Sequence, residues 1–365
     1  MNLRFRFFNT FANLLLFSAC TANVGINEVS ESDLPIVSDS VPEYFKEQLA
    51  EKELLINNVI TKSMGNYSAF VFFTDAHWGD NQKNSPLLIN HIIKNTHIND
   101  VIFGGDVVTT YFNNPNDAII LGDDFRRAFD KLNCNKYFLF GNHDDNSDHY
   151  SENPARQLTE KQVYGYLQYG MSKCSYEGYY NFFFDREECK TRFICLDTGR
   201  YYYPELRGNI IKTARFLINT LNSVKDGWRI VVVSHLWCNL NYEKIREPYF
   251  PDFIKSFLNV LDDYNAGGIG SFTYNGDSIE YNFTNRSSQI VCCIGGHCHI
   301  DSVQYSEAGL PVILITTDST QTVNDDSADV GSVNEQAVSV FVIGYLDGHI
   351  NVFRIGRGKD MTLKL

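Results

Sequence analysis

The sequence is poor in positive charge. Its 365 residues carry 31 Lys and Arg against 44 Asp and Glu, which gives a formal net charge of −13. A protein that binds nucleic-acid backbones without sequence preference needs a basic balance, so no nucleic-acid polymer is expected as a partner. A small phosphorylated substrate is not excluded, because bound metal ions can supply positive charge locally.

The sequence also has no apolar run long enough to span a bilayer. The nearest candidate, Phe11–Phe17, follows Arg4 and Arg6 and is too short for a transmembrane helix. A positive start, a short apolar run and then small residues are typical of a secretory signal peptide, expected here over residues 1–19.

The stretch Leu16–Cys20 (LFSAC) resembles a bacterial lipoprotein lipobox, with Phe17 where Leu is usual. On this interpretation a lipidated Cys20 begins the mature chain and attaches it to the membrane. The alternative is an ordinary cleaved signal with an incidental cysteine. Both predict export to the cell envelope, in the periplasm or at the surface. Residues 20–40, which are polar and acidic, are expected to form a flexible tether.

Cys-x-x-Cys pairs are absent, although the chain has nine cysteines. Export permits disulfides, but most of the cysteines after Cys20 stand in apolar runs and are expected to be small buried side chains. Cys174 and Cys189 flank a Tyr/Phe-rich, hairpin-like stretch and are the best candidates for a disulfide.

Apolar strand-like runs alternate with helix-like segments from residue 41 onward. Helical periodicity covers 41–60, where Tyr44, Phe45, Leu49, Leu54, Leu55 and Val59 can share a face. Strands are expected at 68–74, 100–103, 136–140, 192–196, 229–233, 289–294, 311–316, 338–343 and 350–355. Helices are expected at 87–95, 118–132, around 212–221 and at 253–261. This alternation predicts an α/β fold with parallel strand pairing, in a single domain over 41–365.

Five of these strands end in polar residues that can bind metals. The strand ends carry Asp75-x-His77, Gly105-Asp106, Gly141-Asn142-His143-Asp144, His235 and Gly296-His297-x-His299. In an open α/β sheet the carboxyl ends of strands are where ligands bind, so these side chains are expected to meet at one edge. If the pleat continues, both side chains of each x-separated pair point to one side. The glycines permit sharp turns and close backbone approach.

Imidazole, carboxylate and amide oxygen suit Mn, Fe or Zn better than a soft ion. Asp106 stands centrally enough to bridge two metals about 3.5–4 Å apart, a common arrangement for phosphoester cleavage. Each motif alone has a plainer interpretation: Asp75 and His77 as a capping pair, His235 as a core histidine, Asn142–Asp144 as a turn. A zinc knot at Cys293–His299 (CIGGHCH) fits none of the usual spacings. The five motifs together, in order on strand ends, favour one shared metal site.

The full set DxH, GD, GNHD, H and GHxH, from Asp75 to His299, resembles the calcineurin-like metallophosphoesterases. The resemblance implies a sandwich of two mixed β-sheets packed together and flanked by helices, and two divalent or trivalent metal ions. By match, the first metal would be held by Asp75, His77 and His299, with Asp106 bridging to the second, which Asn142, His235 and His297 would complete. Cys298, between two ligands, would point away into packing.

The resemblance also implies a reaction and two further roles. A hydroxide held on the metals would attack phosphorus, His143 would stabilise the transition state or protonate the leaving oxygen, and Asp144 would orient His143. The alternative is a catalytically weak scaffold of the same fold. Such scaffolds typically lose ligands or the non-ligand histidine, and this sequence keeps all of them.

The pattern departs from purple acid phosphatases, because His77 replaces a glycine and Thr109 stands where a tyrosine ligand would be. It is closer to the cyclic-nucleotide phosphodiesterase-like and general phosphatase branch. The substrate is expected to be a phosphomonoester or phosphodiester, such as a nucleotide or sugar phosphate. Trp78 and Arg200–Tyr203 are candidates for an aromatic wall against a base or sugar, the alternative for the tyrosines being a packed loop.

Overall fold

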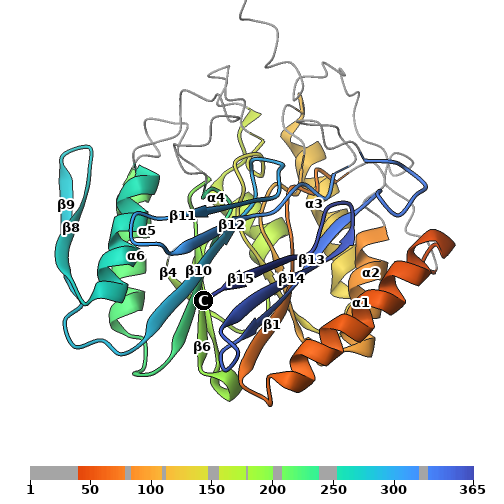
Figure 1. The fold of residues 1–365 in the computed structure, drawn as a ribbon. Coiled ribbons are helices and arrows are strands. Elements are labelled where there is room, and N and C mark those ends of the chain that lie inside the picture. Colours follow the sequence, from red (N-terminus) through yellow and green to blue (C-terminus); the bar gives the residue numbers. More distant parts are fainter. Residues whose placement is uncertain are drawn as a thin grey trace, which may run out of the picture.

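Two mixed β-sheets pack face to face at the centre of the molecule, with helices on both outer sides (Figure 1). The computed structural model describes residues 40–78, 84–108, 112–146, 156–177, 180–199, 208–237, 253–319 and 328–365. The α/β sandwich of two mixed sheets flanked by helices is confirmed. Residues 1–39, with the expected signal peptide, Cys20 and most of the tether, lie outside the described residues, as do Thr109 and Arg200–Tyr203.

The first sheet has the strand order β15-β14-β13-β1-β2-β3. Its strands are β1 (Tyr67–Phe73), β2 (Asp100–Phe103), β3 (Asn135–Phe138), β13 (Ala337–Gly344), β14 (His349–Gly356) and β15 (Met361–Lys364). Strands β1, β2 and β3 run parallel, whereas β13, β14 and β15 pair antiparallel. The parallel half therefore presents three carboxyl ends side by side.

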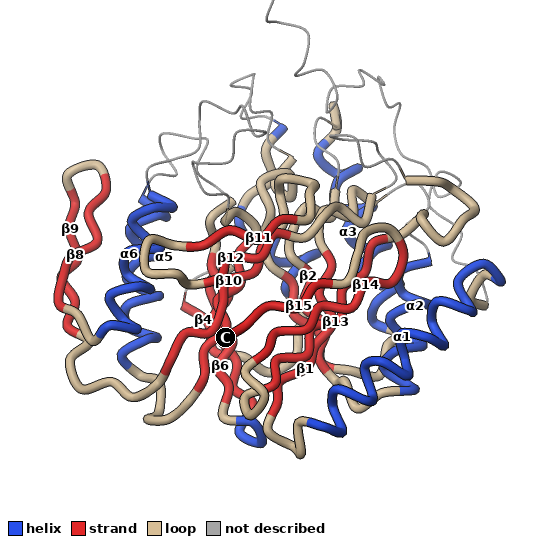
Figure 2. The backbone as a smooth tube through the Cα atoms, in the orientation of Figure 1, coloured by secondary structure: helices blue, strands red, loops and turns tan. Residues whose placement is uncertain are grey.

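The second sheet has the order β11-β12-β10-β7-β6-β5-β4. Its strands are β4 (Ser175–Glu177), β5 (Asn181–Arg186), β6 (Thr191–Leu196), β7 (Arg229–Ser234), β10 (Gln289–Gly295), β11 (Ser302–Tyr305) and β12 (Pro311–Leu314). Its parallel core is β12-β10-β7-β6, with antiparallel strands at both edges. The strands of these two sheets form a red centre with blue helices outside them in Figure 2.

Aromatic side chains fill the layer between the sheets. Phe70 of β1 stacks on Phe341 of β13 at a ring separation of 5.0 Å and meets Phe193 of β6 edge-on at 5.1 Å. All three rings are buried in one cluster with Phe72 and Val231. Aromatic pairs in these geometries combine large buried areas with a preferred separation, so they fix how far apart the two sheets lie.

The outer layers hold the helices. Helices α1 (Glu43–Lys62), α2 (Ser85–Asn95) and α3 (Pro115–Asp130) share one apolar cluster with the first sheet, and α5 (Gly208–Asn222) and α6 (Phe253–Ala266) share another with the second. Shorter segments are α4 (Glu160–Val163), a π-helical turn (Tyr164–Gln168) and a 3₁₀ turn (Glu187–Cys189). Helix α1 buries Phe45, Leu49, Ile56 and Ile60. Leu54, expected on that face, is 63% exposed.

A hairpin of β8 (Ile269–Tyr274) and β9 (Asp277–Asn282) stands apart from both sheets beside α6 (Figure 1). Its turn is Asn275-Gly276, with φ of +50° and +88°. Asn-Gly between two strand-like runs is the strongest short hairpin signal, because both residues readily adopt positive φ angles. Among the described residues, no helix has the length and apolar content needed to cross a membrane.

The expected disulfide between Cys174 and Cys189 is wrong, because both cysteines are free. Strand β4 pairs Ser175 with Phe183, and β5 then continues to Arg186. Cys174 stands just before Ser175, whereas Cys189 ends the 3₁₀ turn that follows β5. Of the described cysteines, Cys298 is disulfide-bonded and six others are free.

We expect Cys174 and Cys189 to carry separate alkyl labels when the protein is denatured without reductant and treated with iodoacetamide. Peptide mass spectrometry would count the labels, and Cys298 serves as the internal control because it should be labelled only after reduction. A peptide pair linked through Cys174 and Cys189 would contradict the fold's register.

Candidate dinuclear metal site

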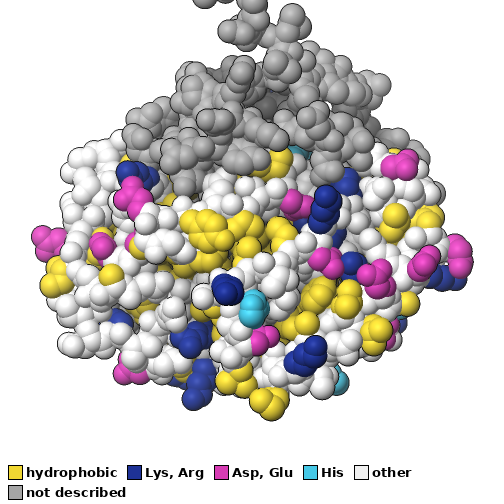
Figure 3. Space-filling view, in the orientation of Figure 1, with side chains coloured by type: hydrophobic (Ala, Val, Ile, Leu, Met, Phe, Trp, Pro, Cys, Tyr) yellow, Lys and Arg dark blue, Asp and Glu magenta, His cyan; other side chains and the backbone are white. Residues whose placement is uncertain are grey.

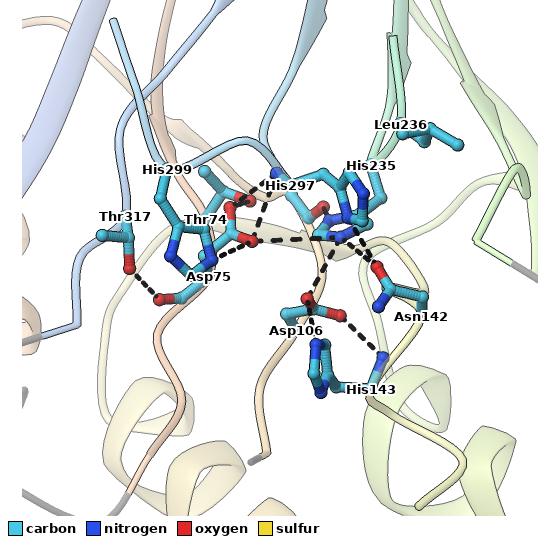
Figure 4. A network of polar contacts seen from close by, with 12 residues as sticks. Thr74, Asp75, Asp106, Asn142, His143, His235, Leu236, His297, His299 and Thr317 are labelled. Atoms are coloured by element: carbon cyan, nitrogen blue, oxygen red, sulfur yellow. Dashed lines mark hydrogen bonds and ion pairs between the residues drawn. The ribbon is translucent and has the colours of Figure 1, made fainter. Parts of the chain in front are cut away.

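Polar side chains from five strand ends converge at one edge of the sandwich (Figure 4). Asp75 and His77 follow β1, Asp106 follows β2, and Asn142 and His143 come shortly after β3. His235 follows β7 in the second sheet, and His297 and His299 follow β10. The sequence-predicted residues therefore come together, with both sheets contributing.

A first ligand group consists of Asp75, His77 and His299, all buried. The Nε2 atoms of His77 and His299 lie 3.3 Å apart, and Nε2 of His299 lies 3.2 Å from Oδ1 of Asp75. Nδ1 of His77 donates to the carbonyl of Val108 at 3.3 Å. That bond places the ring proton on Nδ1 and leaves the Nε2 lone pair for a metal.

A second group consists of Asp106, His235 and His297, joined by Asn142. Nε2 of His235 lies 3.2 Å from Oδ2 of Asp106 and 3.0 Å from Oδ1 of Asn142. The same amide oxygen lies 2.7 Å from Nδ1 of His297. The two groups adjoin, since Oδ1 of Asp75 is 3.9 Å from Nε2 of His235.

A cation fits both groups. Nδ1 of His235 faces the carbonyl of Gly104 at 2.9 Å, so a neutral ring holds its proton there. Its Nε2 lone pair would then face the oxygens of Asp106 and Asn142, which carry lone pairs of their own and are also hydrogen-bond acceptors. Buried acceptors this close require a shared cation or a proton between them. Nitrogen and oxygen donors of this kind suit Mn, Fe or Zn.

Left-handed backbone conformation marks the ligand positions. The φ angle is +53° at Asp75, +42° at His77, +59° at Asp106, +69° at His297 and +53° at His299. Non-glycine residues in this region cost of the order of 1–3 kcal/mol each and persist only where the surroundings hold them. The extended strand thus ends before each ligand, and the pleat does not continue through Asp75-x-His77 or His297-x-His299.

Two glycines leave room for these turns. A Cβ at Gly141 would lie 2.1 Å from Oδ1 of Asp106, and one at Gly296 would lie 2.4 Å from Oδ2 of Asp75. Any side chain at either position would displace a ligand carboxylate. The expected close backbone approach is therefore found at both places.

The facing imidazoles and carboxylates shift one another's pKa. Burial by itself would raise the pKa of Asp75, but His235 and His299 outweigh it and lower the pKa to about 2. Burial would lower the pKa of His235, but Asp106 and Asp75 raise it to about 9. Burial, helped by the charge of His235, lowers the pKa of His297 to about 3. One shared proton therefore sits on His235 when no metal is bound.

His143 lies beside the ligands without belonging to either group. Its backbone N–H donates to Oδ1 of Asp106 at 2.9 Å, and its Nε2 is 3.8 Å from Oδ2 of the same carboxylate. Asp144 is fully buried and accepts backbone N–H groups of Gly141 at 2.7 Å, Val107 at 2.7 Å and Asp106 at 3.0 Å. The hydrogen bonds of Asp144 thus join the loop after β2 to the loop after β3. That Asp144 orients His143 stays a prediction.

Trp78 does not line the site. It is 1% exposed in the core, and its Nε1 donates to Asp124 at 2.8 Å, so the expected wall for a base or sugar is wrong for this residue. Cys298 is buried in the apolar cluster of the second sheet, as expected, and is also disulfide-bonded. A sixth strand end, Thr316 and Thr317 after β12, contacts the site and was missed, although PVILITT is also an apolar run that ends in polar residues.

We expect metal binding to displace the proton of His235. Because its pKa of about 9 keeps the ring charged at pH 7, and a ligand must be neutral, affinity should rise about tenfold per pH unit and level off above pH about 9. Calorimetry at pH 7 in buffers of different ionisation enthalpy counts the protons released.

The matched control is His235→Asn, which keeps a neutral donor without that proton. Proton release should fall by about one per chain in this variant. Equal release from both proteins would show that His235 is neutral in the metal-free state.

The chain is similar to known proteins in sequence pattern and in fold. A family model described as calcineurin-like phosphoesterase matches residues 68–301. The structure resembles a dimetal phosphatase from Danio rerio, with TM-score 0.51 and 11% identity, covering 81% of this chain and 98% of that one. A phosphopantetheinyl hydrolase from Mycobacterium tuberculosis gives TM-score 0.32 and 12% identity over 69% and 91%.

No curated protein compared with the sequence matches it. The family model covers well over half of the chain, from β1 to just beyond His299, and includes every residue of both ligand groups. This chain belongs to the calcineurin-like phosphoesterase family and is a metal-dependent hydrolase of phosphoester bonds.

Proposed function

We propose that the protein hydrolyses a small phosphomonoester or phosphodiester at the edge of the sandwich, with two metal ions held by the two ligand groups. The observation that carries the proposal is the adjacency of the groups, 3.9 Å apart between Asp75 and His235. Asp75, His77 and His299 would hold one ion, and Asp106, Asn142, His235 and His297 the other. The likeness to a solved dimetal phosphatase supports two ions.

The ions, when bound, activate water and neutralise charge on the phosphoryl oxygens. The chain's own residues hold the donors in place: the carbonyls of Val108 and Gly104 fix the tautomers of His77 and His235. Backbone N–H of His297 donates to both oxygens of Asp75 at 3.2 and 3.0 Å, which orients that carboxylate. Such outer contacts pre-organise the ligands before a metal arrives.

His143 is positioned to act on the substrate. Its side chain keeps 13% exposure, whereas Asp106 beside it keeps 1%, so the imidazole is the more accessible of the two side chains. A partly exposed imidazole outside the ligand groups can stabilise charge on the phosphoryl group or donate a proton to the leaving oxygen. We assign His143 that role. Asp144 would support it by holding the backbone of Gly141 and Asp106 through hydrogen bonds.

The substrate is proposed to be compact, such as a nucleotide or sugar phosphate. On the face seen in Figure 3, acidic and basic side chains are interspersed, and apolar side chains gather near the middle. With a net charge of −13, this surface offers no broad attraction to a long polyanion. The metals are proposed to be Mn, Fe or Zn. The rival proposal, a weak scaffold, would be favoured only if both ligand groups failed to retain metal.

We expect His143→Ala to keep both metals and to lose turnover by roughly 10²–10⁴-fold, the range typical of general acid–base catalysis. That corresponds to about 3–5 kcal/mol of barrier at 1.36 kcal/mol per tenfold. The measurement is kcat/KM on alkyl and nitrophenyl phosphate mono- and diesters with added Mn, Fe or Zn, together with metal content.

The leaving group separates the two roles of His143. If it donates a proton, the loss should be largest on alkyl esters and smallest on nitrophenyl esters. Asp106→Ala is the contrasting variant and should lose metal as well as activity. Unchanged rates for His143→Ala on both ester types would remove this residue from the mechanism.

We also propose that the protein is exported and carries a lipid on Cys20, on the strength of the LFSAC stretch. Mass spectrometry of the native membrane fraction should find a mature chain that begins at lipidated Cys20. A soluble product cut at another residue would refute the lipid anchor, and Cys20→Ser should release the protein from the membrane.

A further inference from the structure

A buried segment after β12, residues 315–319, crosses between the two sheets beneath the first ligand group. The backbone N–H of Ile315 donates to the carbonyl of Gly295 in β10 at 2.9 Å. Three residues on, the N–H of Asp318 donates to the carbonyl of Thr74, directly after β1, at 3.0 Å. One short segment is therefore hydrogen-bonded to the ends of β1 and β10, the strands that carry the first ligand group.

The two threonines of this segment reach the ligand residues themselves. Oγ1 of Thr317 donates to the carbonyl of Asp75 at 2.7 Å, and Oγ1 of Thr316 donates to the carbonyl of His299 at 2.9 Å. Both threonines are 0% exposed. Asp75 and His299 come from opposite sheets and belong to the same ligand group.

These carbonyls need an outside donor. Asp75 and His299 both have φ of +53°, so their peptide groups leave the ladder of the sheet. A buried carbonyl that leaves its ladder must find another hydrogen-bond partner. The adjacent hydroxyls of Thr316 and Thr317 are donors found there, and each bonds to the turned backbone of a ligand residue.

Two buried arginines near the end of β14 hold the segment in turn. Arg357, 3% exposed, donates to the carbonyl of Thr317 and, at 3.2 Å, to that of Ser319. Arg354, 1% exposed, pairs with Asp301, and Asp301 accepts the backbone N–H of Thr316 at 3.0 Å. Both threonines thus have fixed backbones, so their hydroxyls meet the ligand carbonyls at set positions.

We propose that Thr316 and Thr317 are positioning residues for the first metal ion, setting its affinity by holding the backbones of Asp75 and His299 while contacting no substrate. The inference rests on the proposed dinuclear function. It predicts an effect confined to one of the two ions, because the hydroxyls of Thr316 and Thr317 bond to His299 and Asp75, which both belong to the first ligand group.

The test is Mn²⁺ binding by calorimetry and by metal content, on the full chain with Thr316→Val and Thr317→Val combined. Wild type should bind two ions. The variant should keep one ion at unchanged affinity and bind the other about 10–100-fold more weakly, the usual loss for an outer-shell contact. Thr317→Ser, which keeps the hydroxyl, should restore the affinity lost in Thr317→Val alone.

Thr191→Val is the matched control. Thr191 is also 0% exposed, and its hydroxyl donates to a backbone carbonyl, that of Cys189. It lies at the amino end of β6, whereas the ligands follow the carboxyl ends of strands. It should lower the melting temperature while leaving both ions in place. Should the double variant fail to fold, the two single valine variants decide the question by the same titration.

The outcomes separate the two proposals. Two ions on wild type and unchanged binding in the valine variants would overturn the positioning role alone. Equal weakening of both ions, matching a general loss of melting temperature, would also overturn it. Fewer than two ions on wild type would overturn the dinuclear assignment and this inference with it.

Discussion

The turned backbone at the ligand positions is the constraint on which the rest of the site depends. A continuing strand would hold side chains two residues apart parallel on one face, roughly 6–7 Å apart along the chain. A left-handed residue at Asp75, His77, Asp106, His297 and His299 ends that regular geometry and turns each ligand out of the pleat. The conformation is unfavourable by itself, so it must be held from outside by groups that a strand would not need.

The sandwich supplies that support because each ligand group draws on both sheets. Asp75 and His77 come from the first sheet and meet His299 from the second, whereas Asp106 from the first meets His235 and His297 from the second. The packing of the two sheets, where Phe70 of the first meets Phe193 of the second edge-on, therefore also brings the metal ligands within reach of one another. A change in core packing that moved one sheet against the other would therefore also move the metal ligands.

Much of this was readable from the sequence, because strand ends and their polar residues are local features. The nine expected strands and the five motifs all appear, but the reason given for Asp75-x-His77 was wrong: the pleat stops at Phe73, and a turned backbone brings the two side chains together. Contacts between distant segments were not readable. Trp78 stands beside a ligand in sequence yet is buried against Asp124, and the hydroxyls that hold the ligand backbones lie some 240 residues from Asp75.

The charge of the site explains how an acidic protein can act on phosphate esters. Without metal, a proton on His235 offsets only one of the two negative charges of the buried Asp75 and Asp106 carboxylates, so these ligand residues repel an anion. Two divalent ions would replace that proton and more than offset the two carboxylates, since the histidines and Asn142 bind as neutral groups. The positive charge would then be confined to a few ångströms at the strand ends. A small phosphoryl group would meet it there, while the remaining surface, with a net charge of −13 in the whole chain, repels longer polyanions.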